Sequence, residues 1–222
     1  MKMHTKLSAI AVAALLSHNA LAQSAGTWLG RIGATTLTPE VSGGALSAPS
    51  LANSTTDVGA STQLSGGITY MLTDNISVDL PLALPFTHTI YGAGALKGVG
   101  KVGQVDALPA SLFLQYRFME ANAKFRPYVG VGATYAYFYN AKGSAALTAT
   151  TNPGGPPTTL TIDAQFILTP QLGFTFALSE KTALDVAYTK SILKTTTRLS
   201  TGQTADVNLD PSSVSLALSF KF

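Results

Sequence analysis

Strict alternation of apolar with small or polar residues recurs along this chain and limits what it can fold into. In residues 213–222, Val214, Leu216, Leu218 and Phe220 alternate with serine, alanine and lysine. A period of two is that of a β-strand, whose successive side chains point to opposite faces. The pattern therefore predicts an all-β chain in which each strand has one apolar face.

This alternation marks eight segments, most of them near the ~10 residues that a tilted strand needs to cross a membrane. Apolar patterns with the helical period are nearly absent. The segments are the region of Trp28 and Ile32, followed by residues 64–72, 76–84, 108–118, 126–137, 162–174, 184–189 and 213–222.

The connections between these segments alternate in length. Short connections at 73–75, 119–124 and 179–181 are separated by long segments rich in Gly, Ser, Thr, Ala and Pro. Short periplasmic turns and long extracellular loops are typical of outer-membrane barrels. The composition of the long segments predicts mobile or irregular surface. These long segments are residues 39–57, 91–105, 140–160 and 194–206.

The chain has few charged residues, so a large share of its side chains is apolar and must be kept away from water. Charged residues make up 11% of the chain, against ~25% in ordinary soluble domains. A soluble sandwich would hide the apolar faces between two sheets, whereas a membrane barrel turns them toward lipid. The alternating connection lengths favour the barrel.

A barrel in lipid must close, because each unpaired backbone group at an open edge costs several kcal/mol. The last strand is therefore predicted to pair with the first. We predict an eight-stranded antiparallel transmembrane β-barrel in the outer membrane of a Gram-negative-type bacterium. The expected partners are outer-membrane lipid and the barrel-assembly machinery, which is expected to recognise the strand ending in Phe222.

The first 22 residues have the pattern of a cleaved secretory signal. Lys2 and Lys6 precede an uncharged apolar run at residues 7–16, and residues 20–22 have the sequence Ala-Leu-Ala. This pattern predicts cleavage before Gln23. The apolar run is about half the ~20 residues of a spanning helix, which disfavours a membrane anchor. The predicted domains are thus a signal peptide, residues 1–22, and the barrel, residues 23–222.

The predicted mature chain has few residues that could catalyse a reaction, and its charge does not favour nucleic-acid binding. Removing residues 1–22 takes away two of 14 Lys and Arg residues and none of 11 Asp and Glu residues. The remaining 12 basic and 11 acidic side chains give no support for nucleic-acid binding. Cysteine is absent and His88 is the one histidine left, so we predict no disulfide, metal site, cofactor or catalytic residue.

Two interpretations of His88 follow from the sequence. A lipid-modifying enzyme would need a nucleophile within reach of this base, and no catalytic signature accompanies it. We therefore interpret His88 as a satisfied histidine at the barrel rim.

Several motifs resemble those of the outer membrane protein W (OmpW) family, in order and across nearly the whole predicted mature chain. They are residues 84–90 (LPFTHTI), 100–103 (GKVG), 108–118 (LPASLFLQYRF), 125–132 (FRPYVGVG), 170–173 (PQLG) and 184–188 (LDVAY).

The resemblance implies an eight-stranded barrel with a narrow hydrophobic passage that admits small apolar molecules and releases them sideways into the membrane. Family members commonly carry a tryptophan at the start of the strand after the third long loop. Here the one tryptophan is Trp28, and Phe166 lies nearest to that position. From the resemblance we expect ligand contacts at Phe86, Ile90, Leu108, Phe113 and Phe166.

Pro81 and Pro85 fall within the third predicted strand. Proline removes a hydrogen-bond donor from a sheet. Two interpretations remain open: a lateral opening in the barrel wall, or a strand end near the extracellular rim.

Charged residues on the polar strand faces are predicted to lie in the lumen. An eight-stranded barrel is just wide enough to be filled by side chains, so buried charges should be paired. We predict a polar plug at the periplasmic end, with a route for ions as the alternative. Lumen charges outside this plug are Arg31 and Asp163, and the predicted plug residues are Asp79, Arg117, Arg126 and Asp185.

The sequence therefore predicts passive uptake of small hydrophobic molecules. The alternative is a structural, adhesion or phage/bacteriocin receptor barrel without transport activity.

Overall fold

Eight long antiparallel strands close into a barrel in the computed structural model, which describes residues 22–222. The predicted signal peptide therefore lies almost wholly outside the described residues. The elements are β1 (Trp28–Thr38), β2 (Ser42–Gly43), β3 (Ser54–Val58), β4 (Ser61–Met71), β5 (Ile76–Ala83), β6 (Phe86–Gly94), β7 (Lys101–Arg117), β8 (Phe125–Gly143), α2 (Ala145–Thr151), β9 (Leu160–Ile162), β10 (Gln165–Ala177), β11 (Thr182–Lys190), β12 (Lys194–Leu199), β13 (Thr204–Asn208) and β14 (Ser212–Lys221).

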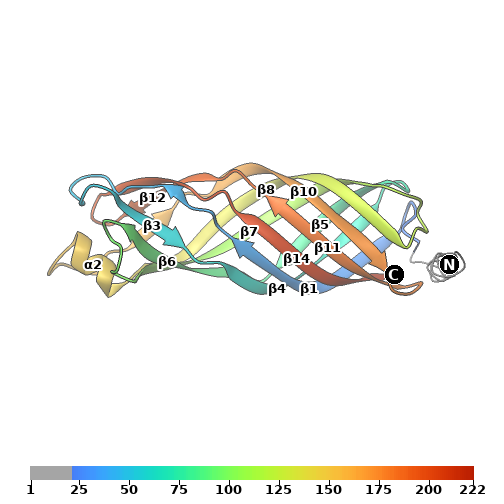
Figure 1. Cartoon of the computed structure of the whole chain (residues 1–222), viewed down its shortest axis with the longest axis horizontal. Helices are drawn as coiled ribbons and strands as arrows, with labels where there is room; N and C mark the ends of the chain where they lie inside the picture. Colours follow the sequence, from blue (N-terminus) through green and yellow to red (C-terminus); the bar gives the residue numbers. More distant parts are fainter. Residues whose placement is uncertain (1–21) are drawn as a thin grey trace, which may run out of the picture.

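The barrel follows chain order, with β5 and β6 together forming the third strand. Neighbours around the wall are β1, β4, β5 with β6, β7, β8, β10, β11 and β14. The predicted closure is confirmed, because β14 pairs with β1 from Leu29↔Lys221 to Thr38↔Ser212. Figure 1 shows the strands running obliquely around the long axis, with the C-terminus at one end and α2 and β12 at the other.

The two-residue period separates a lipid face from a lumen face as predicted. On β7, Leu112 and Leu114 are about half exposed, whereas Phe113, Gln115 and Arg117 are buried. Similar exposed apolar residues on the other strands form a continuous outer band, which a soluble barrel would have to hide.

The prediction of irregular long segments was wrong for much of their length. The ends of β6, β7 and β8 extend the wall beyond the apolar band, and β2, β13, β12 and β9 form a second sheet above the barrel. These strands carry threonine and lysine where membrane strands carry leucine, so no apolar face marks them in the sequence. α2 has seven residues, and within residues 22–222 no helix is long and apolar enough to cross a membrane.

Candidate functional site

A buried ion pair lies near the periplasmic end of the lumen. Nη1 and Nη2 of Arg31 donate to Oδ1 and Oδ2 of Asp79 at 2.6 and 2.7 Å. The Thr69 hydroxyl donates to the same carboxylate at 2.6 Å. Thr69 and Asp79 face each other across β4 and β5, so strand register alone brings these groups together.

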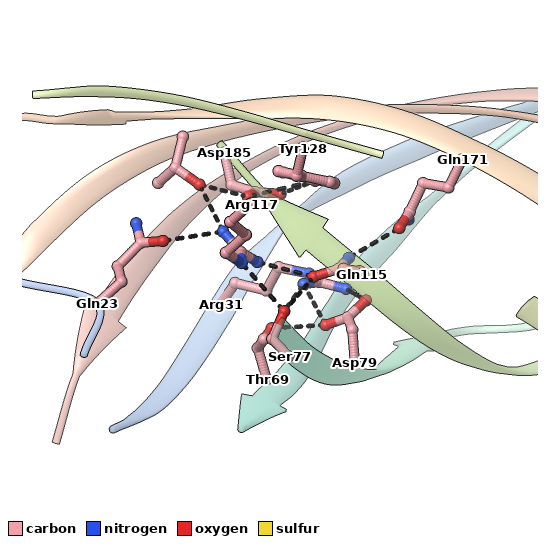
Figure 2. A network of polar contacts seen from close by, with 11 residues as sticks. Gln23, Arg31, Thr69, Ser77, Asp79, Gln115, Arg117, Tyr128, Gln171 and Asp185 are labelled. Atoms are coloured by element: carbon pink, nitrogen blue, oxygen red, sulfur yellow. Dashed lines mark hydrogen bonds and ion pairs between the residues drawn. The ribbon is translucent and has the colours of Figure 1, made fainter. Parts of the chain in front are cut away.

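Arg117 lies at the centre of the network in Figure 2 and is 1% exposed. Its guanidinium donates to Oγ of Ser77 at 3.1 Å and to Oε1 of Gln115 at 2.8 Å. It also donates to Oε1 of Gln23 and to Oγ1 of Thr175, both at 3.0 Å. The acceptors lie on β5, β7 and β10 and in the segment before β1. Arg117 therefore links separate parts of the wall across the lumen.

Arg126 and Asp185 complete this layer. Arg126 is fully buried and donates to the backbone carbonyls of Gln23 at 3.0 Å and Asp74 at 2.6 Å. The hydroxyl of Tyr128 lies 3.3 and 3.4 Å from the two carboxylate oxygens of Asp185. We call this layer the polar plug; it consists of Gln23, Arg31, Thr69, Ser77, Asp79, Gln115, Arg117, Arg126, Tyr128, Thr175 and Asp185.

The four predicted plug residues all lie in this layer, but their partners differ from the prediction. Asp79 pairs with Arg31, and Arg126 donates to carbonyl groups instead of carboxylates. Asp163 does not lie in the lumen, because it pairs with Arg198 at 3.0 Å on the partly exposed second sheet. The sequence pattern did not indicate a plug role for Gln23, Gln115 or Tyr128, although Gln115 stands on a polar strand face.

A cavity of about 210 Å³ lies above the polar plug. Pockets for drug-sized ligands measure ~300–1,000 Å³, so this cavity suits smaller molecules. Its plug end is polar and its extracellular end is apolar, where α2 and the second sheet cover it. The polar end includes Arg31, Thr169, Gln171 and Asp185, and the apolar end includes Ile90, Val102, Val105, Leu147, Leu160 and Leu199.

Three of the five predicted contact residues line this cavity, namely Phe86, Ile90 and Phe113. The other two are corrections. Leu108 has the parity of the outward residues of β7, and Phe166 is 78% exposed with its ring 4.6 Å from that of Tyr135. The two-residue period sends both side chains outward, away from the lumen.

The wall beside the cavity is interrupted between the third strand and β7. Pairing of β5 with β7 ends at Asp79↔Phe113, and pairing of β6 with β7 begins at Phe86↔Ala107. Among the described residues, 80–85 therefore have no partner on β7. We call this interval the wall gap. The cavity is lined by residues from both of its edges, which are Pro81, Leu82, Ala83, Pro109 and Ser111.

The strands on either side of the wall gap remain paired to their other neighbours. β5 pairs with β4 up to Ser65↔Ala83, and β7 pairs with β8 throughout residues 106–117. The third strand does not end at Pro85 but continues as β6, so the interpretation of a strand end at the rim was wrong.

Proline occupies two of the four backbone positions whose N–H groups would point across the wall gap. The amide of Leu84 donates to Leu64 on β4, and that of Arg117 donates toward β5, to Asn75. Because amide directions alternate along a strand, positions 81 and 83 of β5 and positions 109 and 111 of β7 face the gap. Residues 81 and 109 are prolines and have no N–H group to leave unpaired, and Pro85 lies at the break between β5 and β6.

His88 lies in the cavity and not at the rim, which corrects the sequence interpretation. It is 3% exposed, and its Nδ1 lies 2.7 Å from the carbonyl oxygen of Gly59. The outer surface at this level is polar, since Thr87 donates to Asp106 at 2.7 Å. His88 is therefore beyond the apolar band, and burial lowers its pKa below the ordinary value.

Within residues 22–222, no group of three or more His, Cys, Asp or Glu side chains is placed to hold a metal ion.

Comparison with known proteins places these features among outer-membrane barrels. The sequence profile of the OmpW family matches residues 24–222. Outer membrane protein W of Vibrio cholerae serotype O1 is 34% identical over 169 residues, covering 74% of this chain and 76% of that protein. Outer membrane protein W of Escherichia coli (strain K12) is 40% identical over 135 residues, or 60% of each protein. The crystal structure of the outer membrane protein OprG from Pseudomonas aeruginosa has a TM-score of 0.80 and 27% identity, covering 90% of this chain and 97% of that one.

Proposed function

This chain belongs to the OmpW family and lies in the outer membrane, and we propose that it takes up small hydrophobic molecules and releases them sideways through its wall. The observation that carries this proposal is an apolar cavity with a polar plug at one end and a wall gap at its side. A ligand enters from the extracellular loops and leaves between the third strand and β7.

The polar plug supports a lateral exit over a periplasmic one. A hydrophobic molecule leaving downward would have to displace Arg117, whose guanidinium makes four side-chain hydrogen bonds. Hydrogen bonds to charged groups contribute about 1.5–3 kcal/mol each, and an apolar ligand replaces none of them. The wall gap offers a path without that loss.

The three prolines support a gap that stays open. A break in a sheet exposed to hydrocarbon is costly chiefly through its unpaired backbone groups. Pro81 and Pro109 remove two of the four N–H groups directed across the gap, and Pro85, at the break between β5 and β6, has no N–H group either. They also prevent these positions from closing the ladder.

The test replaces the prolines with alanine and so restores their backbone N–H groups. Initial uptake of a labelled aromatic hydrocarbon is compared in cells lacking the protein and in cells carrying the wild type or the variant P81A/P85A/P109A. One restored hydrogen bond of about 1.4 kcal/mol would shift the balance between open and closed wall about tenfold. We expect saturable uptake by the wild type and near-background uptake by the variant.

The matched control is Pro127→Ala, which makes the same chemical change in β8, where Pro127 pairs with Phe174. Uptake by this control should equal that of the wild type, and heat-dependent gel migration shows whether each barrel is folded. Unchanged uptake by the folded triple variant would exclude the lateral route. No uptake of any hydrophobe by the wild type would instead favour a structural, adhesion or receptor role.

A further inference from the structure

The hydrogen bond of His88 determines which of its ring nitrogens is an acceptor. A carbonyl oxygen only accepts, so Nδ1, which lies 2.7 Å from that of Gly59, carries the proton. In the neutral ring, Nε2 then has a free lone pair. Among residues 22–222 no partner is found for Nε2, and His88 lines the cavity.

This acceptor lies in apolar surroundings. His88 pairs with Val105 across β6 and β7, and its ring lies 6.5 Å from that of Phe86. Ile90, the next inward residue of β6, is also buried. An acceptor that faces an apolar cavity gives a hydrogen-bond donor on a ligand a partner there, so that the donor need not be buried unpaired.

His88 also stands close to the wall gap. Phe86 is the first residue of the third strand to pair with β7 above the gap, and His88 is three positions after Pro85. At 3.3 Å per residue, His88 lies about 10 Å along the strand from Pro85. A short amphiphile can therefore place its polar head at His88 and its apolar chain at the gap.

We propose that His88 makes the cavity selective for hydrophobic molecules that carry a hydroxyl donor, such as medium-chain alcohols, over molecules of similar size whose polar atoms only accept. This inference rests on the proposed uptake function and names the ligand class for the same cavity. The hydroxyl donates to Nε2, while ketones and ethers leave that nitrogen unpaired.

The test measures initial uptake of labelled octan-1-ol, octan-2-one and n-octane, each corrected for cells that lack the protein. In the wild type, the rate for the alcohol should exceed that for the ketone by about two- to tenfold, the effect of one net hydrogen bond. His88→Phe keeps an aromatic ring but removes the acceptor, and should bring the ratio to about one. His88→Gln returns an acceptor oxygen and should restore part of the preference.

Thr89→Val is the matched control, because it removes a hydroxyl from the adjacent residue, whose side chain has the outward parity. It should keep the wild-type ratio. Equal uptake of all three compounds by the wild type, above background, overturns the selectivity while leaving the uptake function intact. A ratio that persists in folded His88→Phe also overturns it. Background rates for all three compounds would refute the uptake function itself.

Discussion

Replacing Arg117 and Arg126 with alanine should open the periplasmic end of the barrel to ions. The polar plug contains the charges of Arg31, Arg117 and Arg126 against those of Asp79 and Asp185. Three positive charges and two negative ones make the wild-type plug positive by one charge. The double variant keeps one arginine and two aspartates, so its pore should be negative and prefer cations.

The magnitude follows from the contacts that are lost. Arg117 donates four side-chain hydrogen bonds, and Arg126 donates to the carbonyl groups of Gln23 and Asp74. Each hydrogen bond from a charged donor contributes about 1.5–3 kcal/mol and water recovers part of the loss, so we expect Arg117→Ala to lower the free energy of unfolding by about 3–5 kcal/mol. The vacated space should hold about two or three waters. Ions could then cross this layer of the lumen in contact with water.

Single-channel recording in planar bilayers checks conductance and, from the reversal potential in a salt gradient, ion preference. The wild type should conduct weakly, Arg117→Ala more, and the double variant most and with cation preference. Lys142→Ala is the control, because it removes one positive charge from an exposed site at the loop end. Unchanged conductance in the folded double variant would refute the idea that these arginines close the lumen.

Two further predictions concern the wall itself. A Cβ at Gly33 would lie 2.0 Å from the carbonyl oxygen of Leu216, so Gly33→Ala should disrupt the β1–β14 closure, and the variant should migrate on unheated gels as unfolded protein. Phe222→Ala should lower the amount of assembled barrel in the outer membrane. It should leave the lumen unchanged, because Phe222 is 75% exposed. Fractionation of cells with equal synthesis of the two proteins measures the assembled barrel, and equal amounts would show that Phe222 is not an assembly signal.

The transmembrane strands could be predicted because each lies between two different environments. On β14, Val214, Leu216 and Leu218 face lipid while Ser219 is buried in the lumen, so a two-residue period had to appear. The strands of the second sheet have no lipid face. Their sequence, as in Lys194–Leu199, carries threonines that also occur in loops, and this is why the pattern missed them.

The candidate site could be predicted in part. The positions of Asp79, Arg117, Arg126 and Asp185 followed from strand parity, but the pairing of Asp79 with Arg31 depends on the register between β1, β4 and β5. Periodicity specifies the face of a side chain and not its neighbour across strands. Leu108 was assigned to the passage by family resemblance, against its own parity, and the parity was the better guide.

The burial of His88 could not be predicted from the sequence for a related reason. Its sequence neighbourhood indicates a rim position, while its burial depends on the extension of β6 beyond the apolar band. That extension is held by pairing with β3 and β7, both of which lie partly in segments that composition assigned to loops. A polar group on such an extension therefore cannot be placed inside or outside the lumen without the pairing.

The polar plug and the wall gap are both consistent with the lateral route that we propose. If the lumen were open at the periplasmic end, a break in the wall would expose backbone groups to lipid without giving a ligand any new path. Because the Arg117 guanidinium makes four side-chain hydrogen bonds, the lateral exit that we propose between β5 and β7 would separate no charged hydrogen bonds. The prolines lie on both edges of that gap, with Pro81 and Pro85 on one strand and Pro109 on the other. Pro81 and Pro109 lack N–H groups that would point across the gap, so they leave the pairing of their strands with β4 and β8 intact.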